Sequence, residues 1–151
     1  MSRHSATTIV PFTPEQMYLL VIDMDRYPEF LPWCTKARKY ECEESGFKSE
    51  ITFSFKGIRE TFYTLDQTEP GRKIHITLAS GPFRHLESEW LFTPVEGGTR
   101  IDFYIDFSFK NKLVDITLGP VFGEASRRMV EAFKHRAETL YRDEAAHSPS
   151  G

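Results

Sequence analysis

The chain has 151 residues and a formal net charge of −3 at pH 7, with 40% hydrophobic and 27% charged residues. This length is typical of one domain, which buries roughly two-thirds of its unfolded surface. A weakly acidic chain lacks the overall positive field of DNA-binding proteins, so any contact with nucleic acid has to be local. The two cysteines are too few for a disulfide scaffold and lack the paired spacing of a zinc site. We therefore expect reduced thiols, no metal and no DNA partner.

Composition along the chain indicates its domain organisation and location. No linker or internal repeat interrupts residues 1–143, which we expect to form a single domain. Residues 144–151 are small and polar, and we expect them to form a disordered tail. No window approaches the roughly 18 consecutive apolar residues of a membrane span, and no signal peptide opens the chain. These features predict a cytoplasmic protein that is at most peripheral to the inner membrane.

A strand and a helix are the first predicted elements. Residues 3–10 read as a strand, and Thr13 followed by Pro14 provides a helix N-cap and a first-turn proline. Apolar side chains then recur at helical spacing until just before the next proline: Met17, Leu20, Val21 and Met24.

Residues 27–34 form an aromatic segment held by two prolines. Each proline fixes its own φ and disfavours helix in the residue before it, so Tyr27 and Leu31 cannot lie inside a regular helix. We expect a stiff apolar connector, whose rings either fill the core or meet an apolar partner. We predict that four of its residues, together with the segment around residues 113–122, form the mouth of an apolar pocket and contact a membrane: Phe30, Leu31, Pro32 and Trp33.

Most of the remaining chain has the two-residue period of strands. Apolar side chains alternate with polar ones in five segments between residues 51 and 109. Turn signals separate the segments, including Pro70-Gly71 and Glu96-Gly97-Gly98. This pattern predicts an antiparallel meander with one apolar face.

After Asn111 the apolar period becomes that of an amphipathic helix. Gly119-Pro120 is predicted to interrupt this helix near its start and to let that end move. Small alanines alternate with larger side chains along the apolar stripe, so the sheet would meet short side chains at several levels. The pattern indicates room for a guest between sheet and helix.

Several motifs together resemble one known family. They are residues 27–34, the segment 81–86 with Trp90 and Phe92, residues 100–110, and residues 132–137. In order and spacing they resemble the coenzyme Q-binding family of START-like proteins, also labelled polyketide cyclase/dehydrase. The resemblance covers nearly the whole chain, with one departure at Ser88, where an asparagine is more usual and where a polar contact is therefore in doubt.

The resemblance implies an α+β helix-grip fold. In this fold a curved antiparallel sheet of about six or seven strands wraps around a long C-terminal helix, with a tunnel between them. Family members are associated with binding ubiquinone in support of respiration, and bacterial relatives are described as ribosome-association toxins that block subunit joining. The same sequence pattern carries both descriptions, so both remain open at this stage.

We expect a ligand pocket between the sheet and the C-terminal helix, occupied by ubiquinone or a similar isoprenoid lipid and holding no further cofactor. The 14% aromatic content indicates a wall around something large and apolar, although each wall residue could instead be plain core. The predicted wall residues on the sheet are Phe53, Phe55, Phe62, Ile76, Leu78, Trp90, Phe92, Phe103, Ile105 and Phe107. Those on the helix are Phe122, Ala125, Met129 and Phe133.

The sequence offers few groups for catalysis. Strand alternation turns the charged residues Glu87, Glu89, Asp102, Asp106 and His75 away from the apolar face. Glu60 shares its alternation with Phe62 and is the one candidate acid or base for a cyclase-type reaction, while His85 lies beside a turn and could bind a ligand's polar head. No catalytic triad, metal-ligand set or glycine-rich phosphate loop is present. We predict no catalytic residues and a binding or transfer function.

The alternative function is inhibition of ribosomal subunit joining. A protein that binds the large ribosomal subunit would place cations on phosphate groups. Candidate cations are Lys36, Arg38 and Lys39, or the pair Arg127 and Arg128. An aromatic or polyketide cyclase is a third possibility.

Overall fold

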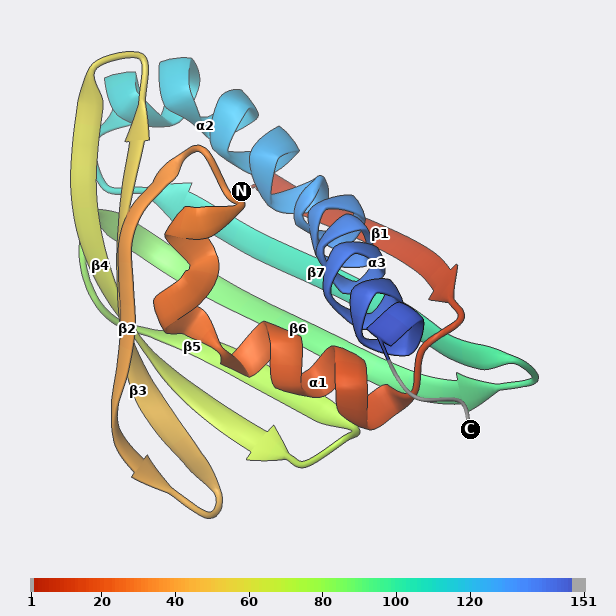
Figure 1. Ribbon diagram of the computed structural model, residues 1–151. Coiled ribbons are helices and arrows are strands. Elements are labelled where there is room, and N and C mark those ends of the chain that lie inside the picture. The colour runs from red at the N-terminus through yellow and green to blue at the C-terminus, as the bar shows by residue number, and fades with distance from the viewer. Residues whose placement is uncertain (1, 148–151) are drawn as a thin grey trace.

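The protein is described by a computed structural model that covers residues 2–147, with side chains from residue 3 to residue 141. Seven strands form one antiparallel sheet in the order β1-β7-β6-β5-β4-β3-β2, and the helices lie across one side of it (Figure 1). The strands are β1 (Ser2–Val10), β2 (Cys34–Glu43), β3 (Gly46–Phe55), β4 (Ile58–Glu69), β5 (Lys73–Ser80), β6 (Phe83–Val95) and β7 (Gly98–Phe109). The predicted helix-grip fold is confirmed.

The period-two pattern of the sequence determines which side chains face the helices. From Leu86 to Phe92 on β6, Leu86, Ser88, Trp90 and Phe92 are buried, while the residues between them are more exposed. β7 alternates in the same way, and its register places Trp90 opposite Phe103. Burial of this apolar face, at roughly 25 cal/mol per Å², stabilises the sheet against the helices.

The helix α1 (Pro14–Ile22) begins with the predicted cap. The Thr13 hydroxyl accepts a hydrogen bond from the Gln16 backbone N–H at 3.1 Å, and the Gln16 side chain accepts one from the Thr13 N–H at 2.8 Å. This capping box satisfies two N–H groups that a helix start otherwise leaves unpaired.

The proline-held segment differs from a plain connector. A 3-10 helix, η1 (Met24–Glu29), includes Tyr27 and Pro28, and the Tyr27 carbonyl accepts hydrogen bonds from the backbone N–H groups of Phe30 and Leu31 at 3.2 and 2.9 Å. Tyr27 is therefore outside a regular α-helix, as predicted. However, the chain is wound into a 3-10 helix at Tyr27 and is not extended. η1 packs against β2, and Tyr27 is buried.

The C-terminal helical region consists of α2 (Lys112–Arg127) and α3 (Met129–His147). The predicted interruption at Gly119-Pro120 is wrong, since α2 continues through both residues and the break lies at Arg128. Leu118 and Phe122 are buried on either side of Pro120, and this packing offsets the cost of a proline inside a helix, about 3 kcal/mol.

The predicted disordered tail begins inside a helix. α3 extends to His147, so residues 144–147 are helical, and residues 148–151 lie outside the described residues.

Phenylalanine rings fill one end of the space between sheet and helix. Phe122 of α2 is at their centre, with six other ring centroids between 4.9 and 6.4 Å from its own. The surrounding rings are Phe53, Phe55, Phe62, Phe83, Phe107 and Phe109. Most of these pairs meet edge to face, the arrangement that aromatic quadrupoles favour.

Candidate functional site

A cavity lies between the sheet and the helices, beside the phenylalanine cluster around Phe122. Its volume is about 60 Å³, and its lining is mainly apolar. Val21 and Met24 close it from the side of α1 and η1, and Phe122 and Met129 close it from the C-terminal helices. A cavity of this size holds a few water molecules, since each needs on the order of 10–15 Å³ by this measure.

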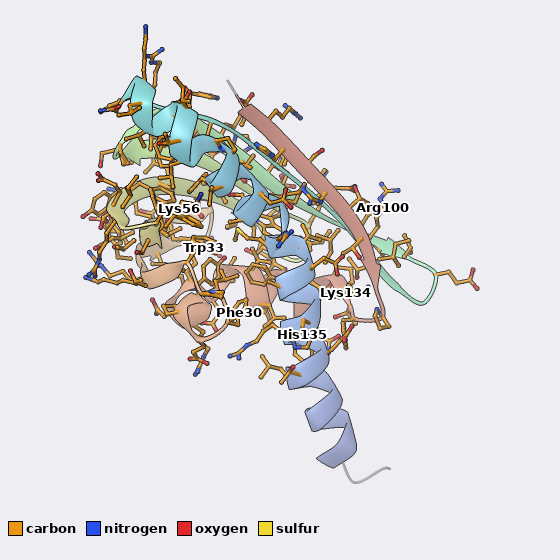
Figure 2. All side chains as sticks on the ribbon, turned by 90° about the horizontal axis from the view of Figure 1, so that it is seen from above. Phe30, Trp33, Lys56, Arg100, Lys134 and His135 are labelled. Atoms are coloured by element: carbon orange, nitrogen blue, oxygen red, sulfur yellow. The ribbon has the colours of Figure 1, made fainter. Side chains whose placement is uncertain are left out.

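A larger groove of about 570 Å³ opens on the surface next to this cavity. The proline-held segment forms one wall of the groove, and Val121, Ala125 and Ala132 of the C-terminal helices contribute to the other. Trp33 and Met129 line both spaces, so their side chains separate the cavity from the groove. Figure 2 places Trp33 on the same side of these helices as Phe30.

Contacts with α3 and β3 hold the proline-held segment in place. The Phe30 ring packs edge to face on Phe133, with centroids 5.1 Å apart, and lies 5.0 Å from the guanidinium of Arg136. Arg136 also pairs with Glu29, the nitrogen and oxygen being 2.8 Å apart. The Trp33 ring stacks on Phe55 at 5.9 Å. The wall between cavity and groove is thus built from stacked rings and one flexible methionine.

Nine of the fourteen predicted wall residues line the cavity or the groove. Those on the cavity are Phe62, Ile76, Trp90, Phe103, Ile105, Phe122 and Met129. Phe55 and Ala125 line the groove, which Met129 also reaches.

Five predicted wall residues line neither space: Phe53, Leu78, Phe92, Phe107 and Phe133. Four of them are used in ring packing instead. Phe53 and Phe107 belong to the cluster around Phe122, Phe92 packs on Tyr18, and Phe133 packs on Phe30.

All four residues of the predicted mouth line the groove, but they differ in exposure. Pro32 is exposed, Phe30 and Trp33 are half-buried, and Leu31 is only 2% exposed. Leu31 therefore belongs to the core and has no surface to offer a membrane. Within the described residues, no helix is both long enough and apolar enough to cross a membrane.

The cavity wall also carries a carboxylate, Asp66, which is not among the residues predicted from the sequence. Asp66 is 4% exposed, and its Oδ1 accepts a hydrogen bond of 2.5 Å from the Thr64 hydroxyl. The Thr64 hydroxyl in turn shares a short hydrogen bond with Ser49. Burial raises the pKa of Asp66 to about 7, and the Thr64 hydrogen bond opposes part of that shift. The signal was the alternation of Phe62, Thr64 and Asp66, which places all three side chains on the inner face.

The hydroxyl groups on the cavity wall donate to protein acceptors. Ser88 donates to the Tyr104 carbonyl at 2.8 Å, Ser126 donates to the Phe122 carbonyl at 2.8 Å, and the Tyr27 hydroxyl donates to the carbonyl of Val21. Ser88, where the resemblance left a polar contact in doubt, thus makes a backbone contact. Burial, and then the nearby Asp66 carboxylate, raise the pKa of Tyr27 well above its usual value.

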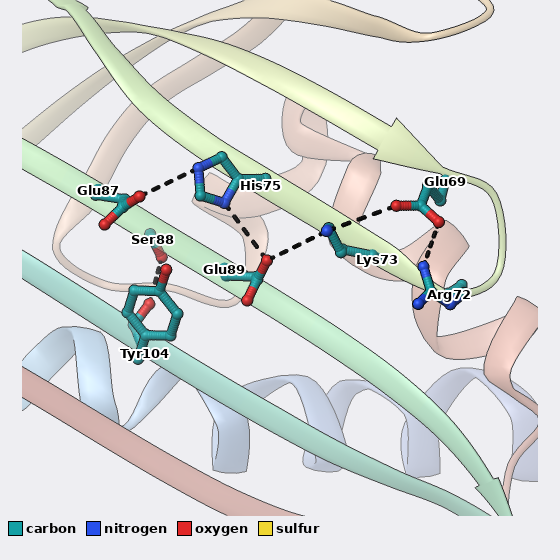
Figure 3. A network of polar contacts seen from close by, with 8 residues as sticks. All are labelled: Glu69, Arg72, Lys73, His75, Glu87, Ser88, Glu89 and Tyr104. Carbon is teal, nitrogen blue, oxygen red and sulfur yellow. Dashed lines mark hydrogen bonds and ion pairs between the residues drawn. The ribbon is translucent and has the colours of Figure 1, made fainter.

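The outer face of the sheet carries the charged side chains that alternation assigned to it. Figure 3 shows His75 between Glu87 and Glu89, with ring nitrogen to carboxylate oxygen distances of 3.3 and 3.4 Å. Lys73 links Glu89, at 3.7 Å, to Glu69. These residues form a charge network on the face opposite the cavity.

Other predicted polar residues are also separate from the cavity. Asp102 pairs with Arg100 on the outer face of the sheet. Asp106 lies on the same face and is half-buried, and its Oδ1 atom is buried without a hydrogen-bond partner among the described residues. Glu60 is exposed and His85 is half-buried, and neither lines the cavity. The structure thus brings none of these groups to the cavity.

The sequence pattern of the family described as polyketide cyclase / dehydrase and lipid transport matches residues 10–134. The chain belongs to this family. The chain is 41% identical to one relative, the ribosome association toxin RatA of Escherichia coli K12, over 142 residues. These residues cover 93% of this chain and 90% of RatA. Coenzyme Q-binding protein COQ10 homolog B of Xenopus laevis is 29% identical over 91% of this chain and 59% of its own length.

Solved structures agree with the family fold. The 18 kDa protein CC1736 of Caulobacter crescentus is 34% identical, with a TM-score of 0.75 over 93% of this chain and 99% of its own. A START superfamily protein of Mycobacterium smegmatis superimposes with a TM-score of 0.77 over 91% of this chain and 98% of its own, at 20% identity. At that identity the second likeness shows the fold alone.

Proposed function

We propose that the protein associates with the ribosome, in the manner that the name RatA describes, and that it acts by binding rather than by catalysis. The observation that carries this proposal is the 41% identity to RatA over nearly the full length of both chains. The likeness to COQ10 homolog B is weaker and spans 59% of that protein. The relatives therefore support ribosome association ahead of quinone carriage, the reverse of the order predicted from the sequence.

Two surface sites offer cations for ribosomal RNA. On β2, Lys36 and Arg38 share one carboxylate, that of Glu50, at 3.5 and 2.7 Å. On α2, Glu124 likewise pairs with two arginines, at 2.6 and 2.9 Å. Each site keeps one unneutralised positive charge, and the cationic side chains are 46–74% exposed. Phosphate groups could replace the shared carboxylates as partners for these cations.

Co-sedimentation with purified ribosomal subunits at several salt concentrations tests this proposal. We expect the protein to pellet with the large subunit at low salt and to be released as salt rises. Reversal of both charges in Lys36→Glu/Arg38→Glu, or in Arg127→Glu/Arg128→Glu, should abolish pelleting for whichever site contacts RNA. Arg72→Glu/Lys73→Glu, at the turn between β4 and β5 and the start of β5, is the matched control. Absence of pelleting by the wild-type protein at low salt would overturn the proposal.

A second candidate function is carriage of an apolar ligand such as ubiquinone. The cavity and groove support it, as do the lipid-transport description of the family and the likeness to COQ10 homolog B. Burial of an isoprenoid tail is worth roughly 0.8 kcal/mol per methylene relative to water, but a bilayer already supplies nearly the same. A carrier of this kind would exchange its ligand with a membrane surface at little net cost.

Ligand entry requires the wall between cavity and groove to move. An apolar cavity that binds benzene has a volume of roughly 150 Å³, whereas this cavity has about 60 Å³. Displacement of Trp33 and Met129 would join the cavity to the groove of about 570 Å³ and make room for a ring and its tail.

Organic extraction and mass spectrometry of the purified protein test the carrier function. Titration of the stripped protein with ubiquinones of different tail lengths follows. We expect stoichiometric binding and a change in tryptophan fluorescence, since both tryptophans line the cavity. A protein that carries no lipid and takes up none of the ubiquinones is not a quinone carrier.

A further inference from the structure

Asp66 is the one charged side chain among the described residues that line the cavity. Among the described residues of the cavity lining, no lysine, arginine or histidine is present to neutralise the Asp66 carboxylate. Burial of a carboxylate without a cationic partner disfavours its ionised form and lowers stability. The position therefore indicates a use for the carboxylate.

We propose that Asp66 binds the polar end of the cavity's ligand, and that this end is a hydroxyl that donates a hydrogen bond, as in a phenol or a hydroquinone. This inference rests on the second candidate function, carriage of an apolar ligand. It adds the chemistry of the ligand's head and the residue that recognises it.

The hydrogen bonds around Asp66 leave one oxygen for a ligand. Thr64 donates to Oδ1, so its own oxygen accepts from Ser49, and the three side chains form a chain that ends on the carboxylate. Oδ2 has no hydrogen-bond partner among the described residues. Asp66 pairs with Phe47 on β3 and Ile76 on β5, and both apolar side chains also line the cavity. A hydroxyl on an apolar ring would find its acceptor at Oδ2 and its apolar contacts on either side.

The protonation state of Asp66 then selects between two forms of the same ligand. An ionised carboxylate only accepts hydrogen bonds, which suits a hydroquinone, whereas a quinone carbonyl needs a donor and so needs the protonated acid. Burial raises the pKa of Asp66 to about 7, so both states are available near neutral pH.

Other titratable groups lie on both sides of Asp66. Tyr27 of η1 shares the cavity with it, and burial raises the pKa of Tyr27 well above its usual value, so this hydroxyl keeps its proton at neutral pH. On its other side Asp66 also lines a surface groove with Glu41, Glu43 and Lys48, and Lys48 pairs with Glu41. Within the cavity, selection between the two ligand forms therefore depends on Asp66.

The test is a titration with a short-tailed ubiquinone and with its hydroquinone, kept reduced under anaerobic conditions, at pH 5.5 and pH 8.5. Tryptophan fluorescence reports binding. We expect the ratio of hydroquinone affinity to quinone affinity to be about tenfold higher at pH 8.5, the value of one hydrogen bond to a charged group. Asp66→Asn should remove this pH dependence, since the amide does not titrate. Asparagine is nearly isosteric with aspartate, and its amide oxygen can still accept the hydrogen bond from Thr64.

Asp102→Asn, on the outer face of the sheet, is the matched control and should keep the wild-type pH dependence. If both ligand forms bind but the ratio is the same at the two pH values, the role of Asp66 is wrong and the carrier function stands. The same conclusion follows if Asp66→Asn keeps the pH dependence. If neither form binds at either pH, the carrier function fails, and this inference fails with it.

Discussion

The two ends of the space between sheet and helices are built from the same strands but packed differently. At one end, six phenylalanine rings surround Phe122 and leave no room for a guest. At the other end, short polar side chains such as Thr64, Ser88 and Ser126 face the interior, and a cavity remains. A period-two pattern that sends apolar side chains inward does not distinguish the two ends. Side-chain volume at facing positions decides which part becomes solid core and which part becomes a site.

The largest effect should come from the solid end. Phe122→Ala removes the central ring of the cluster, and a substitution of this kind in a packed core costs about 3–5 kcal/mol. Denaturant unfolding measures the loss. Val121→Ala, whose side chain is half-buried on the groove, is the control and should cost much less. Equal losses in the two variants would mean that the cluster does not hold the helix to the sheet.

At the cavity end, stability should depend on pH through Asp66. Its pKa is raised from 3.8 to about 7 in the folded protein, so the folded state binds the proton more tightly than the unfolded state. The contribution of Asp66 to stability is then greatest below pH 4 and falls as pH rises to 7, by at most about 1.4 kcal/mol per pH unit. Asp66→Asn should remove this slope and be more stable than the wild type at pH 8. Unfolding curves at pH 5 and pH 8 decide the matter, and an unchanged slope in the variant would contradict the raised pKa.

A smaller change in stability but a clear change in kinetics is expected for the wall between the two spaces. Met129→Ala should open the wall and speed uptake of a short-tailed ubiquinone several-fold, at a cost of about 1–2 kcal/mol for a half-buried side chain. Stopped-flow fluorescence measures the association rate. Ala132→Gly, which lies on the groove alone, is the control for nonspecific loosening of the helix. An association rate equal to that of the wild type would place the entry route elsewhere.

The smallest effect belongs to the outer face. His75→Gln removes the partner of Glu87 and Glu89 in a partly exposed charge network, and such substitutions usually change stability by no more than about 0.5 kcal/mol. Thermal unfolding at neutral pH measures the change. A loss as large as that in Phe122→Ala would show that the outer network, and not only the inner packing, holds the sheet.

Local signals in the sequence were sufficient for most of the fold. The capping box at Thr13 and the alternation along β6 and β7 depend on residues a few positions apart, and the structure has them as predicted. Pro120 was misleading, because its local cost is outweighed by the burial of Leu118 and Phe122, and Phe122 packs on rings from distant strands.

The candidate site was predictable only in part. Alternation brought most of the predicted apolar residues to the cavity or groove, yet Phe53, Phe92 and Phe107 pack against other rings instead. Asp66 was missed because an aspartate near the end of a strand is usually exposed. Here η1 brings Met24 and Tyr27 to the same cavity wall and buries it.

By itself, the sequence determined which face of each strand is apolar, where α1 begins and which family the chain resembles, since these depend on local spacing and motif order. The tertiary structure alone decided where rings interlock, where a cavity remains, and that a carboxylate lies on its wall. Those outcomes depend on the volumes of side chains that are far apart in the chain and meet only when the helices pack on the sheet.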